Sequence, residues 1–243
     1  MTGTAPLPRL LLVEDDASLQ RFVALALDDL GVELVVAGSV DEALAQLRAG
    51  PFVLVISDLM MPGRSGFELI DTLAAEPPLL GTGRLAIFSA GINPETSLRL
   101  QRPEVWRLLP KPCSVGDLIA CVQDALAATA TAPTTPAVHT EAADDATAIA
   151  RYFGGNAPLF QALRDSCLRQ FPADLAAGEQ ACAAGDLATL RHLAHSLKSV
   201  LLTLGRDEDS ALAKSLEDAC AAGDAGQARE LWPRLGHVLH RLR

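Results

Sequence analysis

The first half of this 243-residue chain alternates short apolar runs with segments of helical periodicity. The runs are almost continuously apolar, which is typical of strands buried on both faces, and the helical segments between them fit parallel crossovers. The runs lie at 9–14, 33–37, 52–57, 84–89 and 105–109, and the helical segments near 17–30, 40–49, 65–75, 94–102 and 115–128. This pattern predicts an α/β domain over residues 8–127 with a doubly wound, five-stranded parallel sheet.

The sequence changes character after residue 127. Residues 128–145 are rich in Pro, Thr and Ala and have no apolar periodicity, so we expect a linker. Beyond it leucines recur every three or four residues, interrupted by Gly185-Asp186 and Gly223-Asp224. Each Gly-Asp pair combines a helix stop with an N-cap. Residues 146–243 are therefore predicted to form an all-α domain of four or five helices, packed as an antiparallel four-helix bundle.

Composition and charge exclude several classes of protein. The apolar runs are far shorter than the about 20 residues of a membrane-spanning helix, and the N-terminus lacks the features of a secretory signal, so we expect a cytoplasmic protein without membrane insertion. The five cysteines include no Cys-x-x-Cys pair, which argues against a disulfide framework and a zinc site. The net charge is −10 and neither domain is basic, so nucleic acid is not an expected partner.

Polar side chains follow four of the five predicted strands. Glu14 and Asp15 end the first strand, Asp58 follows the third, Ser89 ends the fourth and Lys111 follows the fifth. Open α/β sheets bind ligands outside the carboxyl ends of their strands, at the point where the strand order reverses. We therefore expect these five side chains to converge there, although they are far apart in the sequence.

This set of side chains favours phosphoryl chemistry. Three neighbouring carboxylates repel one another unless a cation neutralises them, and an all-oxygen site suits Mg2+. Lys111 and Ser89 supply a compact cation and a hydroxyl donor for phosphoryl oxygens. Asp58 is then the carboxylate that can attack a phosphoryl group. Each residue alone fits an ordinary surface position, and it is their joint placement at the strand ends that predicts a site.

Four short motifs surround these residues: LLVEDD at 11–16, SDLMMPG at 57–63, FSA at 88–90 and KP at 111–112. Through them residues 9–126 resemble a two-component response-regulator receiver domain. The resemblance implies that Asp58 is the phospho-acceptor. It also implies a set of Mg2+ ligands and a pair of phosphate-binding and switch residues: Glu14, Asp15, Asp58 and the backbone carbonyl of Met60 for the metal, and Lys111 and Ser89 for the phosphoryl group.

One position departs from the receiver pattern. Receivers often carry Tyr or Phe at the site occupied here by Leu108, so the aromatic switch coupled to Ser89 is expected to be absent or altered. Trp106 lies in the same predicted strand, but its register points elsewhere, and we expect it to pack in the core.

One histidine in the second half lies in the middle of a strongly helical segment. The leucines of this segment define the predicted core face, which places His195 on the opposite, solvent-exposed stripe with Lys198 and Ser199. An exposed imidazole can accept a phosphoryl group, Lys198 can offset its charge, and Ser199 leaves room for an approaching protein. Surface histidines are usually idle, however, and a metal pair with His192 lacks an acidic or cysteine ligand.

The wider pattern favours the phosphoryl role. It comprises ATLRHLAHSLKS at 188–199, LG at 204–205, LAKSLE at 212–217 and AGD at 222–224, with YFGGN at 152–156 and FP at 171–172 upstream. Residues 146 to about 235 thereby resemble a histidine-containing phosphotransfer (HPt) domain, which implies that His195 is the phospho-histidine and that Lys198 and Ser199 support it. Ser199 stands where the family usually has Gly, and Arg206 where Ala is common, so we expect narrowed access to His195.

These features together predict a two-component phosphorelay protein. A histidine kinase or hybrid kinase would phosphorylate Asp58, His195 would accept or donate a phosphoryl group, and a downstream response regulator is a possible further partner. No segment resembles an ATP-binding kinase domain, and no substrate-pocket signal favours a metabolic hydrolase. The alternative is a regulatory adaptor, in which phosphorylation of Asp58 controls docking of the helical domain to a kinase or other partner without relay through His195.

Overall fold

The computed structural model describes residues 6–90, 94–127 and 145–242. The chain forms two compact units, one built around a sheet and one whose secondary structure, among these residues, is helical. No helix within these described ranges is both long enough and apolar enough to cross a membrane.

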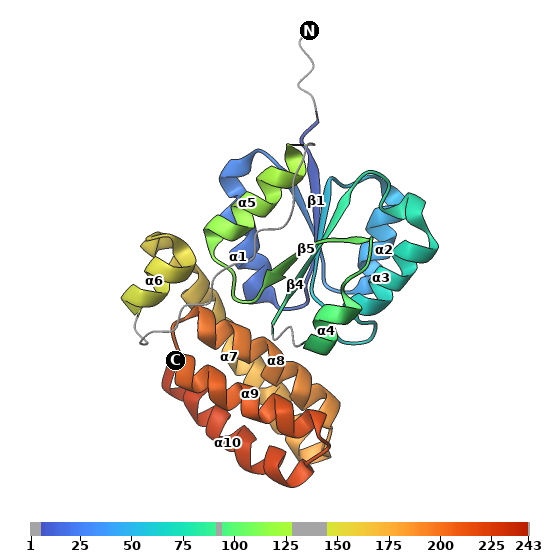
Figure 1. Ribbon diagram of the computed structural model, residues 1–243. Helices are drawn as coiled ribbons and strands as arrows, with labels where there is room; N and C mark the ends of the chain where they lie inside the picture. The colour runs from blue at the N-terminus through green and yellow to red at the C-terminus, as the bar shows by residue number, and fades with distance from the viewer. Residues whose placement is uncertain (1–5, 91–93, 128–144, 243) are drawn as a thin grey trace. The chain divides into compact units, whose positions relative to one another are not determined.

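The first unit is built on five parallel strands in the order β2-β1-β3-β4-β5. The strands are β1 (Arg9–Val13), β2 (Glu33–Ala37), β3 (Leu54–Ser57), β4 (Arg84–Ser89) and β5 (Val105–Pro110). The helices between and after them are α1 (Ala17–Leu27), α2 (Val40–Ala49), α3 (Gly66–Ala75), α4 (Pro94–Arg99) and α5 (Val115–Leu126). Figure 1 shows α1 and α5 on one face of the sheet and α2 and α3 on the other. The predicted doubly wound α/β fold is confirmed, and its strand order reverses between β1 and β3.

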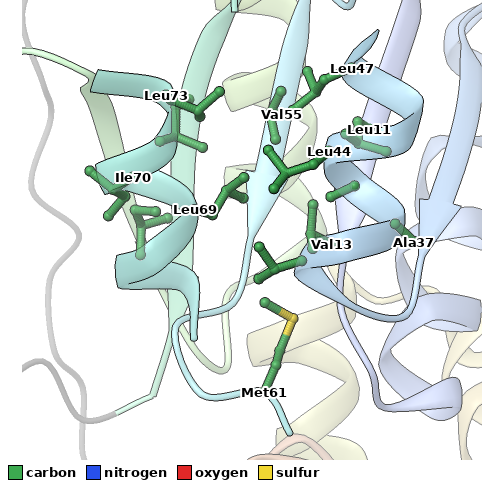
Figure 2. Packing of buried hydrophobic residues seen from close by; sticks show 14 of the residues in the cluster. Leu11, Val13, Ala37, Leu44, Leu47, Val55, Met61, Leu69, Ile70 and Leu73 are labelled. Atoms are coloured by element: carbon green, nitrogen blue, oxygen red, sulfur yellow. The ribbon is translucent and has the colours of Figure 1, made fainter. Parts of the chain in front are cut away.

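Apolar side chains fill the space between the sheet and the helices α2 and α3. Val13 and Val55 from the strands meet Leu44 of α2 and Leu69 of α3, and all four are at most 3% exposed (Figure 2). Burying one such side chain stabilises a fold by about 1.5–3 kcal/mol. This packing anchors β1 and β3 against α2 and α3 and so determines where the carboxyl ends of the two strands lie.

Three helices of this unit begin at a serine that satisfies backbone groups of the first turn. The Oγ atoms of Ser39 and Ser114 each accept a first-turn backbone N–H, at 3.3 and 3.0 Å. At α3 the carboxylate of Glu68 accepts the backbone N–H of Ser65 at 2.8 Å. Such caps specify where a helix starts. The start of α3 thus fixes the length of the loop that follows β3.

Gly66, the first residue of α3, lies against the backbone at the end of β3. A Cβ atom at this position would lie 2.1 Å from the carbonyl oxygen of Asp58 and 2.8 Å from Cα of Leu59. Because neither backbone atom can move without shifting the loop, we expect Gly66→Ala to destabilise the chain by about 1–3 kcal/mol, as overpacking does. Urea unfolding measures this change.

A matched control is Gly116→Ala in the first turn of α5. Its Cβ would meet only Ser114 Oγ at 3.6 Å, an ordinary contact. This variant should unfold at the wild-type urea concentration or slightly above, since Ala favours helix. Equal unfolding midpoints for the two variants would show that the close approach at Gly66 is not tight.

Over residues 145–242 the second unit contains the helices α6 (Asp145–Phe153), α7 (Ala157–Ala184), α8 (Leu187–Thr203), α9 (Asp207–Ala221) and α10 (Ala225–Leu242). The helix α8 packs against α7 and α9, and α10 packs against α7 and α9, so these four form the bundle (Figure 1). Gly185 and Gly223 adopt the left-handed conformation at the two predicted stops, and Asp186 caps α8. The all-helical second half is confirmed.

The position of Trp106 differs from the prediction. A β-bulge between Leu85 and Ala86 places two residues of β5 opposite one of β4, and Trp106 is only half-buried. The guanidinium carbons of Arg84 and Arg107 lie 4.5 and 4.4 Å from its ring centroid. A bulge re-aims side chains locally, so strand alternation could not locate this indole, which stacks on arginines rather than packing in the core.

Candidate functional site

Three carboxylates lie together at the carboxyl ends of β1 and β3. Glu14 and Asp15 follow β1 and Asp58 follows β3, and one ligand oxygen from each lies within 4.8 Å of the others. Glu14 and Asp58 are 1% and 2% exposed. Burial raises the pKa of Glu14 to about 8, although the ammonium of Lys111 opposes the shift. Carboxyl groups this close and this buried stay ionised together only beside a cation.

Lys111, which directly follows β5, supplies one such cation. Its Nζ atom donates to Glu14 Oε2 at 2.5 Å and to Asp58 Oδ2 at 2.9 Å, and its side chain is 2% exposed. Burial alone would lower the pKa of Lys111, but the carboxylates of Asp58 and Glu14 raise it above its ordinary value. The lysine therefore stays charged and bridges the ends of β1 and β3.

The carboxylate of Asp58 is held from both sides. Its Oδ1 atom accepts the backbone N–H groups of Leu59 at 2.6 Å and Met60 at 3.2 Å, while Oδ2 accepts the ammonium of Lys111. Ser89 ends β4 and is 3% exposed, and its carbonyl oxygen accepts the backbone N–H of Lys111 at 2.9 Å. The five side chains expected at the strand ends thus lie at one edge of the sheet, as the topology requires.

The acidic cluster fits a magnesium ion. Across the described residues, Glu14, Asp15 and Asp58 are the one set of three acidic, His or Cys side chains placed to hold a metal ion. Oxygen donors of this kind suit Mg2+, which retains waters and accepts phosphate oxygens. The charge of a bound Mg2+ would also balance the negative charge that Lys111 alone leaves on the acidic cluster. The role of the Met60 carbonyl as a further ligand stays a prediction.

The environment of His195 differs from the prediction. Its side chain is 2% exposed rather than presented to solvent, and the helix α8 that carries it packs against both α7 and α9. Its Nδ1 atom lies 2.7 Å from Oε1 of Glu217 on α9. Its Nε2 atom is buried and has no hydrogen-bond partner in the part of the chain that the structure describes. Of the two ring nitrogens, Nδ1 therefore has a hydrogen-bond partner and Nε2 has none among the described residues.

Glu217 is a site residue that the sequence interpretation missed. Its two oxygens contact His195 Nδ1 and Lys198 Nζ, the latter at 2.5 Å. Burial would raise the pKa of this carboxyl, but the hydrogen bonds and charges of His195 and Lys198 lower it to about 2. Glu217 is therefore a carboxylate at neutral pH. Lys198 forms an ion pair with Glu217, and its expected role in offsetting phosphoryl charge stays a prediction.

A signal for Glu217 was present in the sequence. On α9 it shares one helix face with Ala213, Leu216 and Cys220, all of which are buried. An acidic residue at a core position of an amphipathic helix needs a buried cationic or donor partner. Residue spacing alone could not tell which side chain of a neighbouring helix would be that partner.

Ser199 lies one turn after His195 and is also buried, at 2% exposed. Its Oγ atom donates to the carbonyl oxygen of His195 over 3.5 Å, a long contact. A glycine at this position would leave more space beside the imidazole. The expected narrowing of access to His195 is in keeping with the burial of both side chains.

Comparison with known proteins gives two family matches. The model of the response regulator receiver domain matches residues 10–123, and the model of the Hpt domain matches residues 162–243. The response regulator receiver protein CpdR of Brucella abortus is 30% identical over 121 residues, which cover 49% of this chain and 98% of that protein. The crystallised chemotaxis protein CheY4 of Vibrio cholerae is 26% identical with a TM-score of 0.45, covering 49% of this chain and 98% of that one.

A larger relative is the virulence sensor protein BvgS of Bordetella pertussis. It is 33% identical over 144 residues, which make up 57% of this chain. The matched segment is only 12% of the length of that sensor protein.

Proposed function

Because the chain belongs to the response regulator receiver family and has an Hpt domain after its receiver domain, we propose that it is a phosphorelay protein. In this proposal Asp58 accepts a phosphoryl group from a histidine kinase or hybrid kinase, and His195 accepts or donates one. The observation that most strongly supports it is the buried bridge of Lys111 between Glu14 and Asp58. A downstream response regulator is the proposed further partner.

At the receiver site the reaction is an in-line displacement at phosphorus. A carboxylate oxygen of Asp58 forms the new O–P bond while the N–P bond of the donor phosphohistidine breaks, and the leaving imidazole keeps the bonding electron pair. The backbone N–H groups of Leu59 and Met60 fix the direction of the carboxylate. Mg2+, when bound by Glu14, Asp15 and Asp58, supplies charge neutralisation for the phosphoryl oxygens. Lys111 holds its ammonium beside the reacting oxygen.

At the helical site Glu217 sets the roles of the two imidazole nitrogens. An ionised carboxylate can only accept a hydrogen bond, so its contact with Nδ1 requires the proton to be on Nδ1. The lone pair on Nε2 is then the nucleophile. When His195 accepts a phosphoryl group, Nε2 forms an N–P bond as the O–P bond of an aspartyl phosphate breaks. The departing carboxylate takes the electron pair of the broken bond. The proposal requires that Nε2 become accessible to the donor during transfer.

The burial of Nε2 also supports a second candidate function. If His195 stays covered, phosphorylation of Asp58 would act through docking of the helical domain to a partner, and the chain would be a regulatory adaptor. Incubation with a labelled small phosphodonor and Mg2+, followed by acid and base treatment, tests the proposal. Acid-stable, base-labile label marks an aspartyl phosphate, and acid-labile, base-stable label marks a phosphohistidine.

Glu217 also makes the stability of the helical unit depend on pH. Its pKa is about 2 in the folded chain against an ordinary value of 4.5, so its stabilisation is complete above about pH 4.5 and is lost as pH falls toward 2. We expect this carboxyl to contribute at most about 3 kcal/mol to that loss. The indole NMR signal of Trp232, a buried residue of α10, reports unfolding of this unit alone.

Glu217→Gln is the corresponding variant, since the amide keeps the shape but cannot titrate. Its helical unit should lose less stability than the wild type between pH 4.5 and 2. Asp218→Gln, at the next residue and exposed, is the control and should follow the wild-type pH curve more closely. Parallel curves for the wild type and Glu217→Gln would contradict the assigned pKa shift.

A further inference from the structure

The ammonium of Lys111 has a third neighbour besides the two carboxylates. The ring centroid of Phe88 lies 4.9 Å from its Nζ atom, with the ammonium over the ring. Phe88 is the residue before Ser89 in β4, pairs with Leu109 of β5, and is 1% exposed. A cation within about 6 Å of an aromatic face is attracted by the ring quadrupole, more strongly where water is excluded. The lysine is thus held by two carboxyl groups and one π face.

These three contacts respond differently to phosphoryl transfer. The carboxylate of Asp58 changes its charge and shape when it becomes an acyl phosphate, and the carboxylate of Glu14 is shared with Mg2+ when the ion is bound. The ring of Phe88 carries no charge that titrates or reacts, so its attraction for the ammonium is the same before and after transfer. It is the one invariant contact of the three.

We infer that Phe88 is a positioning residue, which holds the Lys111 ammonium where the incoming phosphoryl oxygens need it. The inference rests on the proposed phosphorylation of Asp58. It assigns a specific electrostatic role to a residue that the sequence pattern shows only as a buried strand position. By this role the ring would hold the ammonium in place while Asp58 is phosphorylated and Glu14 binds Mg2+.

A second phenylalanine of the same unit separates this role from packing. Phe52 is 3% exposed, and the guanidinium carbon of Arg9 lies 4.4 Å from its ring centroid. Phe52 precedes β3 and Arg9 begins β1, so this pair lies at the amino ends of the strands, away from Asp58. Phe52 is buried to a similar degree and also contacts a cation, but the side chain of Arg9 is 30% exposed and plays no part in the site.

The test uses the full chain with phenylalanine analogues incorporated at position 88. Increasing numbers of ring fluorines weaken the attraction for a cation while nearly preserving the size of the ring. The rate constant for phosphorylation of Asp58 by acetyl phosphate with Mg2+ is measured for each analogue. We expect it to fall step by step with fluorination, by about three- to tenfold in total. The same analogues at position 52 should leave the rate constant within about twofold of the wild-type value.

The thermal unfolding midpoint of each analogue protein checks that the fold is kept. A rate constant that does not change along the position-88 series would overturn the inference, and so would an equal fall along the position-52 series, which would indicate a packing effect. If the wild-type chain itself takes no phosphoryl group on Asp58, the proposed function fails and this inference fails with it. A wild-type protein that is phosphorylated while the position-88 series stays flat refutes the role of Phe88 alone.

Discussion

Asp58→Asn should reduce acid-stable, base-labile label from a small phosphodonor to below about 1% of the wild-type amount, because it removes the nucleophile itself. The amide oxygen can still accept the backbone N–H groups of Leu59 and Met60, which now bind Oδ1. One negative charge also leaves a crowded acidic cluster. The amide nitrogen takes the place of Oδ2 and cannot accept from Lys111, which keeps its hydrogen bond to Glu14. The thermal unfolding midpoint of the variant is therefore measured, to show that loss of label does not reflect unfolding.

The control for this variant is Asp29→Asn. Asp29 is an exposed aspartate in the turn after α1, and the same chemical change there should leave labelling at the wild-type level. Labelling is measured in the presence and absence of EDTA, since the acidic cluster is proposed to need Mg2+. Persistent acid-stable, base-labile label on Asp58→Asn would indicate that Glu14 or Asp15 is the phospho-acceptor and would contradict the proposed mechanism.

The receiver site was predictable because topology alone brings its residues together. In a parallel sheet every strand ends at the same edge, so Asp58 and Lys111 must approach each other whatever the loops do. The strand pattern predicted the sheet, and the polar residues at the ends of four of the five strands predicted the site. What it could not give is the burial of Lys111 between the two carboxylates or its contact with Phe88, because these depend on side-chain directions after the last strand residue.

The helical site was less predictable for a physical reason. A helix face is assigned as exposed when its residues are polar, but polar residues of two helices can also satisfy each other across an interface. His195 and Lys198 on α8 do so with Glu217 on α9. Leucine spacing predicted the helices and the two Gly-Asp pairs predicted where α8 and α10 begin, but neither pattern shows which faces of neighbouring helices meet. Trp106 was misplaced for a similar local reason, since a bulge interrupts strand alternation.

The second large effect is expected at His195 and distinguishes relay from adaptor. His195→Gln removes the nucleophilic nitrogen, while its amide can still donate to Glu217, which also keeps its ion pair with Lys198. The buried carboxylate is therefore not left without a donor, and the helical unit should stay folded. This variant should show no acid-labile, base-stable label. The control His192→Ala, three residues earlier on the same helix, should label like the wild type.

Transfer can be tested between two variants of the chain without knowing the cognate partners. His195→Gln is loaded with label on Asp58, freed of phosphodonor, and mixed with Asp58→Asn and Mg2+. Under the relay proposal, acid-labile label appears on Asp58→Asn, whose only proposed acceptor is His195, and it does not appear on a double variant lacking both residues. If label never leaves the donor, and if signalling in cells persists with His195→Gln, then Nε2 stays covered and the adaptor function replaces the relay.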